Sequence, residues 1–327
     1  MRTGRELILA TKPFAKEDRN KSWRLLLSTL FLWIGALAGT VFMPYLLLKL
    51  LFSILAGLLM VRMFIIYHDY QHHAILHRSV PADIIMSLYG MYVLVPPSIW
   101  KRSHDYHHNH NSKLFSASIG SYPIATKEKF LSMTKSEQRL YLFVRHPFTI
   151  FMGYFTMFIY GMCISSFLSA PRKHYDSLIA LIAHGLIAYG AITMFGWQFW
   201  LLTIFLPIFI ASAIGAYLFY AQHNFPTTSF SDKGEWKYEV AALESSSYMV
   251  MPRFMRYMTG NIGYHHIHHL NSRIPFYRLP ETMEAIEELQ AAKTTSLHIK
   301  DIIACFRLKV WDPERKKMIG FREMKEA

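Results

Sequence analysis

The sequence predicts an all-α integral membrane protein with about four transmembrane helices, interfacial helices and a histidine-rich polar cap. The chain has 327 residues, of which 52% are hydrophobic. A stretch of about 20 apolar residues crosses a bilayer as a helix. Three stretches contain no Asp, Glu, Lys or Arg: 24 residues at 25–48, 26 residues at 146–171 and 46 residues at 177–222. Such long uncharged stretches are rare in the core of a soluble helical protein.

The first half of the chain is expected to cross the membrane twice. Residues 1–24 are polar and basic and lack the apolar region of a secretory signal peptide. Helices are expected at 25–43 and 45–66, with a turn at Pro44 between them. Residues 80–100 contain Asp83 and two prolines, and predict a short interfacial or re-entrant helix.

The second half is expected to cross twice more. Residues 146–171 are apolar and aromatic, and predict an interfacial or re-entrant segment. Spans are expected at 177–196 and 198–220, with breaks near Gly196 and Pro207. We therefore expect one domain over 1–327, divided into a cytoplasmic segment (1–24), two spans (25–66), a polar block with an interfacial helix (67–145), an interfacial or re-entrant segment (146–171), two spans (177–220) and a polar tail (221–327).

This even number of spans places every polar block on one side of the membrane. The formal net charge of +13 lies mainly in the two ends and the polar loops. Cytoplasmic flanks of membrane helices collect Lys and Arg, so these blocks are expected on the cytoplasmic side, and the membrane would be the inner one if the protein is bacterial. The charge favours anionic lipids and acidic partner proteins, and no nucleic acid partner is expected. The two cysteines, Cys163 and Cys305, imply no disulfide framework.

Most of the 17 histidines fall into three groups. Positions i, i+3 and i+4 share one face of a helix, so each group directs two or three imidazoles the same way. All three groups are expected at the ends of membrane segments, on the same side. The groups are His68-x3-His72-His73, His104-x2-His107-His108 and His265-x2-His268-His269.

Histidines in this number predict two metal ions. Imidazole suits Fe, Zn, Cu and Ni, and one zinc takes at most four ligands. The eight histidines of these groups that fit the spacing, which are all but His73, therefore exceed the needs of one such ion. Asp69 and Asp105 each follow the first histidine of a group, where a carboxylate either accepts the other ring N–H of a ligand or remains solvated. Histidines outside the pattern are expected in supporting, surface or isolated positions, and His77 has no assigned role; they are His73, His77, His110, His266, His146, His174, His184 and His298.

These groups resemble the three histidine boxes of membrane fatty acid desaturases. The segment FYAQHNF (219–225) resembles the one that supplies a further ligand in that family, here His223. The stretches 236–248 and 259–281 are similar to bacterial acyl-lipid desaturases of the delta-12/omega-6 type, as are RHPF (145–148) and the tail 310–321. The first box, HDYQHH, departs from relatives that commonly carry Cys-Gly after the aspartate.

The resemblance implies a di-iron enzyme that uses O2 and two electrons to place a cis double bond in an acyl chain. The substrate would be an acyl-lipid, acyl-CoA or acyl-carrier chain among the membrane lipids. The donor would be a separate ferredoxin or cytochrome b5, because the His-Pro-Gly-Gly motif of a fused cytochrome b5 domain is absent. The implied iron ligands are His68, His72, His104, His107, His108, His223, His265, His268 and His269, with Asp69, Asp105, Asn261 and Tyr264 supporting them.

Other functions share parts of this pattern. Hydroxylases, ketolases and acetylenases, including carotenoid enzymes, carry the same boxes, and only the product separates them. A histidine-rich metal transporter would need polar or acidic residues within its spans. The uncharged stretch 177–222 argues against a transporter, although His184 lies in it. A membrane scaffold without activity gives no reason for three matched histidine groups.

Overall fold

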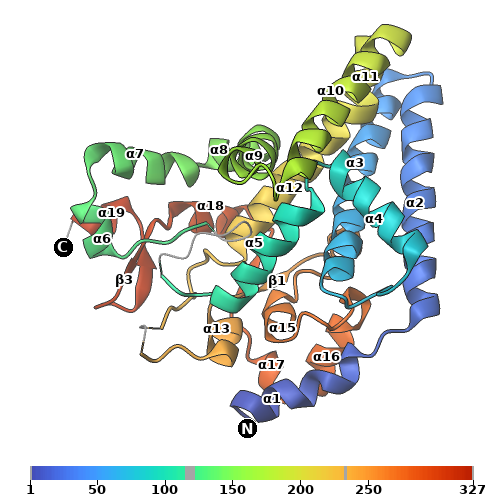
Figure 1. Cartoon of the computed structure of the whole chain (residues 1–327). Coiled ribbons are helices and arrows are strands. Elements are labelled where there is room, and N and C mark those ends of the chain that lie inside the picture. The colour runs from blue at the N-terminus through green and yellow to red at the C-terminus, as the bar shows by residue number, and fades with distance from the viewer. Residues whose placement is uncertain (1, 115–121, 232–233, 326–327) are drawn as a thin grey trace.

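Figure 1 shows a computed structural model of the chain, and the structure describes residues 2–114, 122–231 and 234–325. The described residues form helices and two small two-stranded sheets. This confirms the expected all-α membrane architecture. Four helical runs are long and apolar enough to cross a membrane: α2 (Arg19–Phe42), α3 (Leu46–Gln71), α10 (Tyr175–Phe195) and the run Trp197–Ala221, which joins α11 (Trp197–Trp200), the π-helix η3 (Leu201–Phe205) and α12 (Leu206–Ala221).

The first two spans extend beyond their expected bounds. Helix α2 begins at Arg19 because the Asp18 carboxylate accepts the Lys21 N–H, at 3.0 Å, and so caps the helix. Helix α3 continues past residue 66 to Gln71, so that His68 lies within its last turn. Helix α3 therefore continues beyond the apolar part of the span into the histidine-rich polar part of the protein.

The outer faces of the spans are apolar and exposed. Phe31 of α2 is 77% exposed, and Met194 of α10 is 74% exposed. Apolar surfaces of this extent are unusual on soluble monomers and suit contact with lipid tails. In Figure 1 these helices project together from one end of the molecule, while the histidine-bearing elements gather at the other.

The segment predicted as one short helix at 80–100 is two helices. Helix α4 (Val80–Tyr92) and helix α5 (Pro97–His110) meet at an angle of 90°. Pro96 and Pro97 disfavour continuation of α4, while Pro97 suits the first turn of α5. Because of this bend, α5 carries the second histidine group across the end of the bundle.

The remaining elements are short. On the N-terminal side and between the spans they are α1 (Gly4–Thr11), the 3-10 helix η1 (Lys12–Ala15), α6 (Lys127–Ser132), α7 (Lys135–Val144), α8 (Pro147–Phe151), the π-helix η2 (Tyr154–Ser165) and α9 (Ser166–Ser169). After the last span they are α13 (Tyr238–Glu244), α14 (Arg253–Met258), α15 (His265–Leu270), η4 (Phe276–Arg278), α16 (Leu279–Ala285), α17 (Glu287–Gln290), α18 (Ile299–Arg307) and α19 (Phe321–Lys325). Strands β1 (Tyr248–Val250) and β2 (Thr294–Ser296) pair in parallel, and β3 (Val310–Asp312) pairs antiparallel with β4 (Lys317–Ile319).

Helix α3 is the central element of the bundle and packs against both α2 and α12. Gly57 permits the close approach to α12, because a Cβ at this position would lie 3.0 Å from the Pro207 carbonyl oxygen and the Ile210 side chain. Small residues commonly allow such approaches between membrane helices. This packing brings the end of α12, followed by His223, toward the end of α3.

The third histidine group does not lie at the end of a span, contrary to expectation. It occupies α15, which is separated from the last span by residues 222–264. Strand β1 supports α15, since the Met249 N–H donates to the Gly263 carbonyl oxygen at 2.7 Å. A Cβ on Gly263 would lie 2.5 Å from the Met249 carbonyl oxygen, so glycine is required at this position, two residues before His265. Tertiary contacts of the polar tail therefore position this group.

Candidate metal centre

Nine buried histidines from four segments converge beneath the bundle. His68 and His72 lie at the end of α3, and His223 follows α12. Helix α5 presents three imidazoles and α15 presents three more, on the faces that the i, i+3, i+4 spacing predicts. The nine are His68, His72, His104, His107, His108, His223, His265, His268 and His269, each at most 8% exposed.

The nine histidines divide into two clusters, each with its ligand atoms within 4.8 Å of one another. The five-histidine cluster consists of His68, His72, His104, His108 and His268. The four-histidine cluster consists of His107, His223, His265 and His269. Each cluster thus contains histidines from several segments. The adjacent pairs His107–His108 and His268–His269 are each divided between the two clusters.

The spacing of the ring nitrogens fits metal ligation. In the five-histidine cluster, His104 Nε2 lies 2.9 Å from His68 Nε2 and 3.2 Å from His108 Nε2. In the four-histidine cluster, His265 Nε2 lies 3.0 Å from His223 Nε2 and 3.1 Å from His269 Nε2. Two nitrogens that bind the same ion at about 2.1 Å, with an N–metal–N angle near 90°, are about 3.0 Å apart. The residues present therefore fit a metal ion in each cluster.

Burial also keeps these imidazoles in the form that ligates. It lowers the pKa of His265, His268 and His269 well below the ordinary value, and neighbouring imidazoles lower it further. Burial likewise lowers the pKa of His223 to about 4, against a smaller opposing effect of its hydrogen bond to the Ser245 carbonyl. Metals bind neutral imidazole, so the clusters are ready for a cation at neutral pH.

The carboxylate of Asp69 contacts the ring of His68 in the five-histidine cluster. Its Oδ1 lies 3.1 Å from His68 Nδ1, and its Oδ2 accepts the Phe276 N–H at 2.6 Å. Asn261, another expected supporting residue, donates its Nδ2 to the Phe276 carbonyl oxygen at 3.0 Å. An outer carboxylate that accepts the ring N–H fixes the tautomer and ring plane of a ligand. Asp69 and Asn261 thus meet at the same residue of the polar tail.

The other expected supporting residues lie elsewhere. The Asp105 side chain is 45% exposed and pairs with Lys101 at 3.2 Å, because its position on α5 faces away from the imidazoles. Tyr264 precedes α15, where its ring packs on Tyr248 and its hydroxyl accepts a bond from Arg256 at 3.4 Å. The structure therefore brings Asp69 to a ligand but directs Asp105 and the Tyr264 hydroxyl away from the clusters. Tyr70 and Tyr106 also point elsewhere, toward Asp83 and His110.

Two contacts with the ligands were missed from the sequence. Trp100 stacks on His104, with ring centroids 4.6 Å apart and planes 15° apart. His223 Nδ1 donates to the Ser245 carbonyl oxygen at 3.0 Å. Trp100 precedes His104 by four residues, and this spacing places both side chains on one face of the helix, so the contact could have been predicted from the sequence. The Ser245 carbonyl has no such signal because its role depends on the path of the chain.

Histidines outside the pattern stay outside the clusters. His266 is buried but points away from its neighbours, and its Nε2 donates to the Leu289 carbonyl oxygen at 3.2 Å. His73 and His77 are exposed, and their rings contact one another with centroids 4.3 Å apart and planes tilted by 56°. His174 contacts Ser98, and His184 contacts Tyr154. These five side chains therefore make their contacts outside the two clusters.

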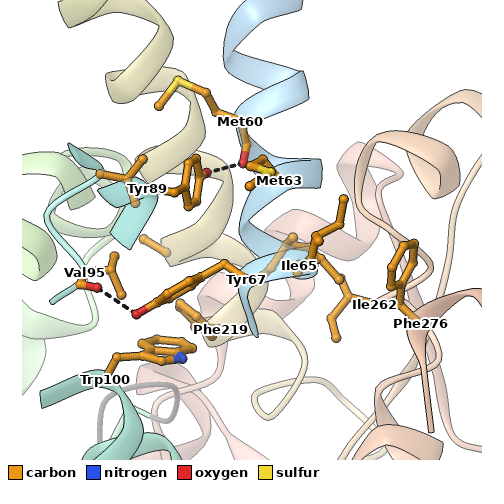
Figure 2. Close-up of a cluster of buried hydrophobic side chains, with 14 of the residues drawn as sticks. Met60, Met63, Ile65, Tyr67, Tyr89, Val95, Trp100, Phe219, Ile262 and Phe276 are labelled. Atoms are coloured by element: carbon orange, nitrogen blue, oxygen red, sulfur yellow. Dashed lines mark hydrogen bonds between the residues drawn. The ribbon is translucent and has the colours of Figure 1, made fainter. Parts of the chain in front are cut away.

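An apolar cavity adjoins both clusters. It is lined by His68 and His104 of one cluster and His265 of the other, and its volume is about 40 Å³. Sites for small ligands commonly have such a lining of apolar side chains with a few polar groups. Figure 2 shows part of its wall, where the Tyr89 hydroxyl donates to the Met60 carbonyl oxygen at 2.6 Å. The other labelled wall residues are Ile65, Val95, Phe219 and Ile262.

The fold and site define a helical membrane protein with two histidine clusters suited to metals beside a cavity with a mainly apolar lining. Residues 45–300, which include all nine histidines, match the family model described as fatty acid desaturase. The chain belongs to the fatty acid desaturase family, and is an oxidoreductase that acts on fatty acyl chains.

Three relatives illustrate this membership. A fatty acid desaturase of Bacillus subtilis is 30% identical over 98% of this chain and 92% of the relative. An sn-1 oleoyl-lipid 12-desaturase of Anabaena variabilis is 22% identical over 84% of this chain and 78% of the relative. A chloroplastic omega-6 fatty acid desaturase of Glycine max is 25% identical over 84% and 66%. The predicted similarity to delta-12/omega-6 desaturases, including bacterial ones, is confirmed.

Proposed function

We propose that this desaturase is a di-iron enzyme that uses O2 to introduce a cis double bond into the acyl chain of a membrane lipid. The observation that carries the proposal is the cavity wall, which contains imidazoles of both clusters. An apolar chain in this cavity lies beside both candidate metal positions. The proposed ligands are the nine histidines of the two clusters.

The chemistry matches what the chain supplies. Removing hydrogen from an unactivated methylene exceeds the power of acid and base side chains, so the iron ions supply the oxidising chemistry when bound. O2 takes up the two hydrogens of the chain with two electrons and two protons, and leaves as two waters. The residues of the chain hold the metals, orient the ligands through Asp69, and bind the acyl chain in an apolar cavity.

The proposed substrate, the electron donor and the membrane side of the clusters rest on different observations. One relative is named as an oleoyl-lipid desaturase, which favours an acyl-lipid over an acyl-CoA or acyl-carrier chain as the substrate. The two electrons come from a separate ferredoxin or cytochrome b5 type protein. The basic net charge favours the cytoplasmic side for the clusters, and the inner membrane in a bacterium.

Mass spectrometry of total fatty acids tests this proposal. Cells that express the intact protein with iron, oxygen and a ferredoxin system are compared with cells that express His268→Ala. We expect a new double bond only with the intact protein, because His268 belongs to the five-histidine cluster. His298→Ala, an exposed histidine outside both clusters, is the matched control and should keep the product.

Three results would contradict the proposal. An active, membrane-inserted His268→Ala protein would remove the ligand assignment. A hydroxyl or keto product would move the chain to the related oxygenases. Absence of both product and bound iron, in an inserted protein with a working donor, would favour the metal transporter.

A further inference from the structure

The segment that joins α1 to α2 contacts the chain that follows box one (His68–His73) and the chain that follows box three (His265–His269). We call residues 11–19 the N-terminal clamp. On the box-three side, the Thr11 hydroxyl accepts a bond from Asn271 Nδ2 at 2.8 Å, and Asn271 directly follows α15. Arg278 Nη1 donates to the carbonyl oxygens of Pro13 at 3.1 Å and Lys16 at 3.0 Å. The clamp is therefore fastened to the chain that leaves box three.

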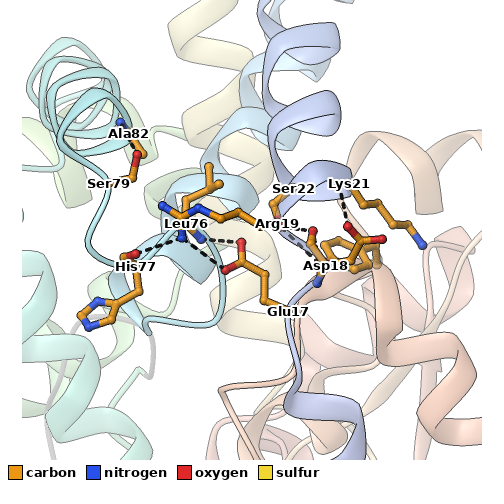
Figure 3. Close-up of polar contacts among 10 residues, drawn as sticks. Glu17, Asp18, Arg19, Lys21, Ser22, Leu76, His77, Ser79 and Ala82 are labelled. Atoms are coloured by element: carbon orange, nitrogen blue, oxygen red, sulfur yellow. Dashed lines mark hydrogen bonds and ion pairs between the residues drawn. The ribbon is translucent and has the colours of Figure 1, made fainter.

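The other end of the clamp binds the loop that follows box one (Figure 3). Glu17 Oε1 accepts the Leu76 N–H at 2.6 Å. Arg19 Nη1 donates to the His77 carbonyl oxygen at 3.1 Å. Residues far apart in the sequence thus link box one to box three through one short segment.

The loop held by the clamp has a costly backbone conformation. His73, Leu76 and Arg78 have φ values of 58°, 50° and 60°, in the left-handed region that favours glycine. A residue other than glycine is strained in this region and persists there only where surrounding contacts impose the conformation. Leu76 is fully buried, so its N–H would be expensive to leave without a partner.

The same loop terminates the helix that carries the ligands. The His73 N–H bonds to the Tyr70 carbonyl oxygen at 2.9 Å, and the Ala74 N–H bonds to the Asp69 carbonyl oxygen at 3.0 Å. These two bonds around a left-handed residue form a Schellman motif at the end of α3. His72 is the last residue before it, so relaxation of the loop would turn this imidazole away from the cluster.

We propose that Glu17, with Arg19, is a positioning residue for box one, and that it acts on the five-histidine cluster alone. That cluster takes His68 and His72 from box one and His268 from box three, whereas the four-histidine cluster takes nothing from box one. A hydrogen bond that a backbone N–H donates to a carboxylate is about twice as strong as one between neutral groups. The bond from the Leu76 N–H to Glu17 is therefore suited to offset the strain of the left-handed residues in the loop. The inference rests on the proposed metal binding by both clusters.

Titration of the metal-free full-length protein with Co²⁺ in detergent tests this role without any need for activity. The visible absorption of bound Co²⁺ reports the geometry of its ligands. We expect the intact protein to bind two Co²⁺ per chain. Glu17→Ala should bind one with unchanged affinity and one about 10-fold to 100-fold more weakly, as outer contacts of metal ligands do when lost. Glu17→Gln should keep most of the affinity, since its amide oxygen still accepts the Leu76 N–H.

Glu6→Ala is the matched control, because Glu6 is an exposed carboxylate on α1 of the same N-terminal region. Two tight Co²⁺ sites in Glu17→Ala, with an unchanged spectrum, would overturn the inference and leave the proposed function intact. Equal weakening of both sites would also overturn it, because a general loss of folding would then explain the result. If Glu17→Ala does not fold, Arg19→Gln should weaken the same single site, and two unchanged sites would overturn the inference. An intact protein that binds no Co²⁺ would instead overturn the proposed function.

Discussion

Replacement of Asp69 by asparagine tests how the first ligand is oriented. The carboxylate accepts two donors, His68 Nδ1 at 3.1 Å and the Phe276 N–H at 2.6 Å, and is 1% exposed. An amide has one oxygen, so Asp69→Asn satisfies one donor and turns an NH2 group toward the other. A buried donor without a partner costs about 1–3 kcal/mol. We expect metal affinity of the five-histidine cluster to fall by about 10-fold to 100-fold, which corresponds to about 1.4–2.8 kcal/mol.

The assay is competition between the protein and a chelator of known affinity for Co²⁺. Asp105→Asn is the matched control, since Asp105 has the same position after its histidine but is 45% exposed and pairs with Lys101. It should bind both ions like the intact protein, because an exposed pair of this kind contributes at most about 1 kcal/mol. Unchanged affinity in Asp69→Asn, or equal losses in both variants, would refute this account of ligand orientation.

Two further predictions concern the cavity and the cap. Gly215 lines the cavity, and a Cβ at this position meets only Phe158, at 3.8 Å, so a leucine side chain fits there and takes up cavity space. Gly215→Leu should therefore lower conversion of long acyl chains about 10-fold or more without loss of metal. Gly185→Leu, in open space on α10, should leave conversion unchanged, and equal losses of the two variants in fatty acid analysis would refute the prediction. Burial lowers the pKa of His266 to about 4, so the metal-free protein should lose stability as pH falls from about 6.5 to 4, by up to about 3 kcal/mol from this residue. His266→Gln should lose less over that range in chemical unfolding, and equal losses would contradict the prediction.

The spans and histidine groups were predictable because they depend on local pattern. Uncharged stretches of sufficient length predicted the four spans, and the i, i+3, i+4 spacing predicted which imidazoles turn inward. His266, which lies off that spacing, indeed points toward the Leu289 carbonyl instead. In these cases one segment contains all the information that its structure requires.

The division of ligands into clusters was not predictable. His107 and His108 are adjacent but belong to different clusters, as are His268 and His269. Successive residues of a helix point about 100° apart, so neighbours meet different partners, and the sequence does not say which. Only the packing of α3, α5, α15 and the end of α12 determines it.

Contacts between distant segments were also beyond the sequence. Asp69 and Asp105 have the same local context, yet only Asp69 meets a ligand, because the Phe276 N–H reaches it across 207 residues. The N-terminal segment was predicted to be polar, basic and cytoplasmic, without any contact to the histidine groups. Its contacts through Glu17 and Thr11 depend on where box one and box three meet in the fold.

The central claim is that the two histidine clusters hold two iron ions. The most direct measurement is the iron content of the purified full-length protein, by elemental analysis combined with Mössbauer spectroscopy of protein produced with ⁵⁷Fe. We predict two irons per chain, with nitrogen-rich coordination at both and loss of iron in His268→Ala. One metal per chain, zinc in place of iron, or two irons that remain fully bound in His268→Ala would contradict the account.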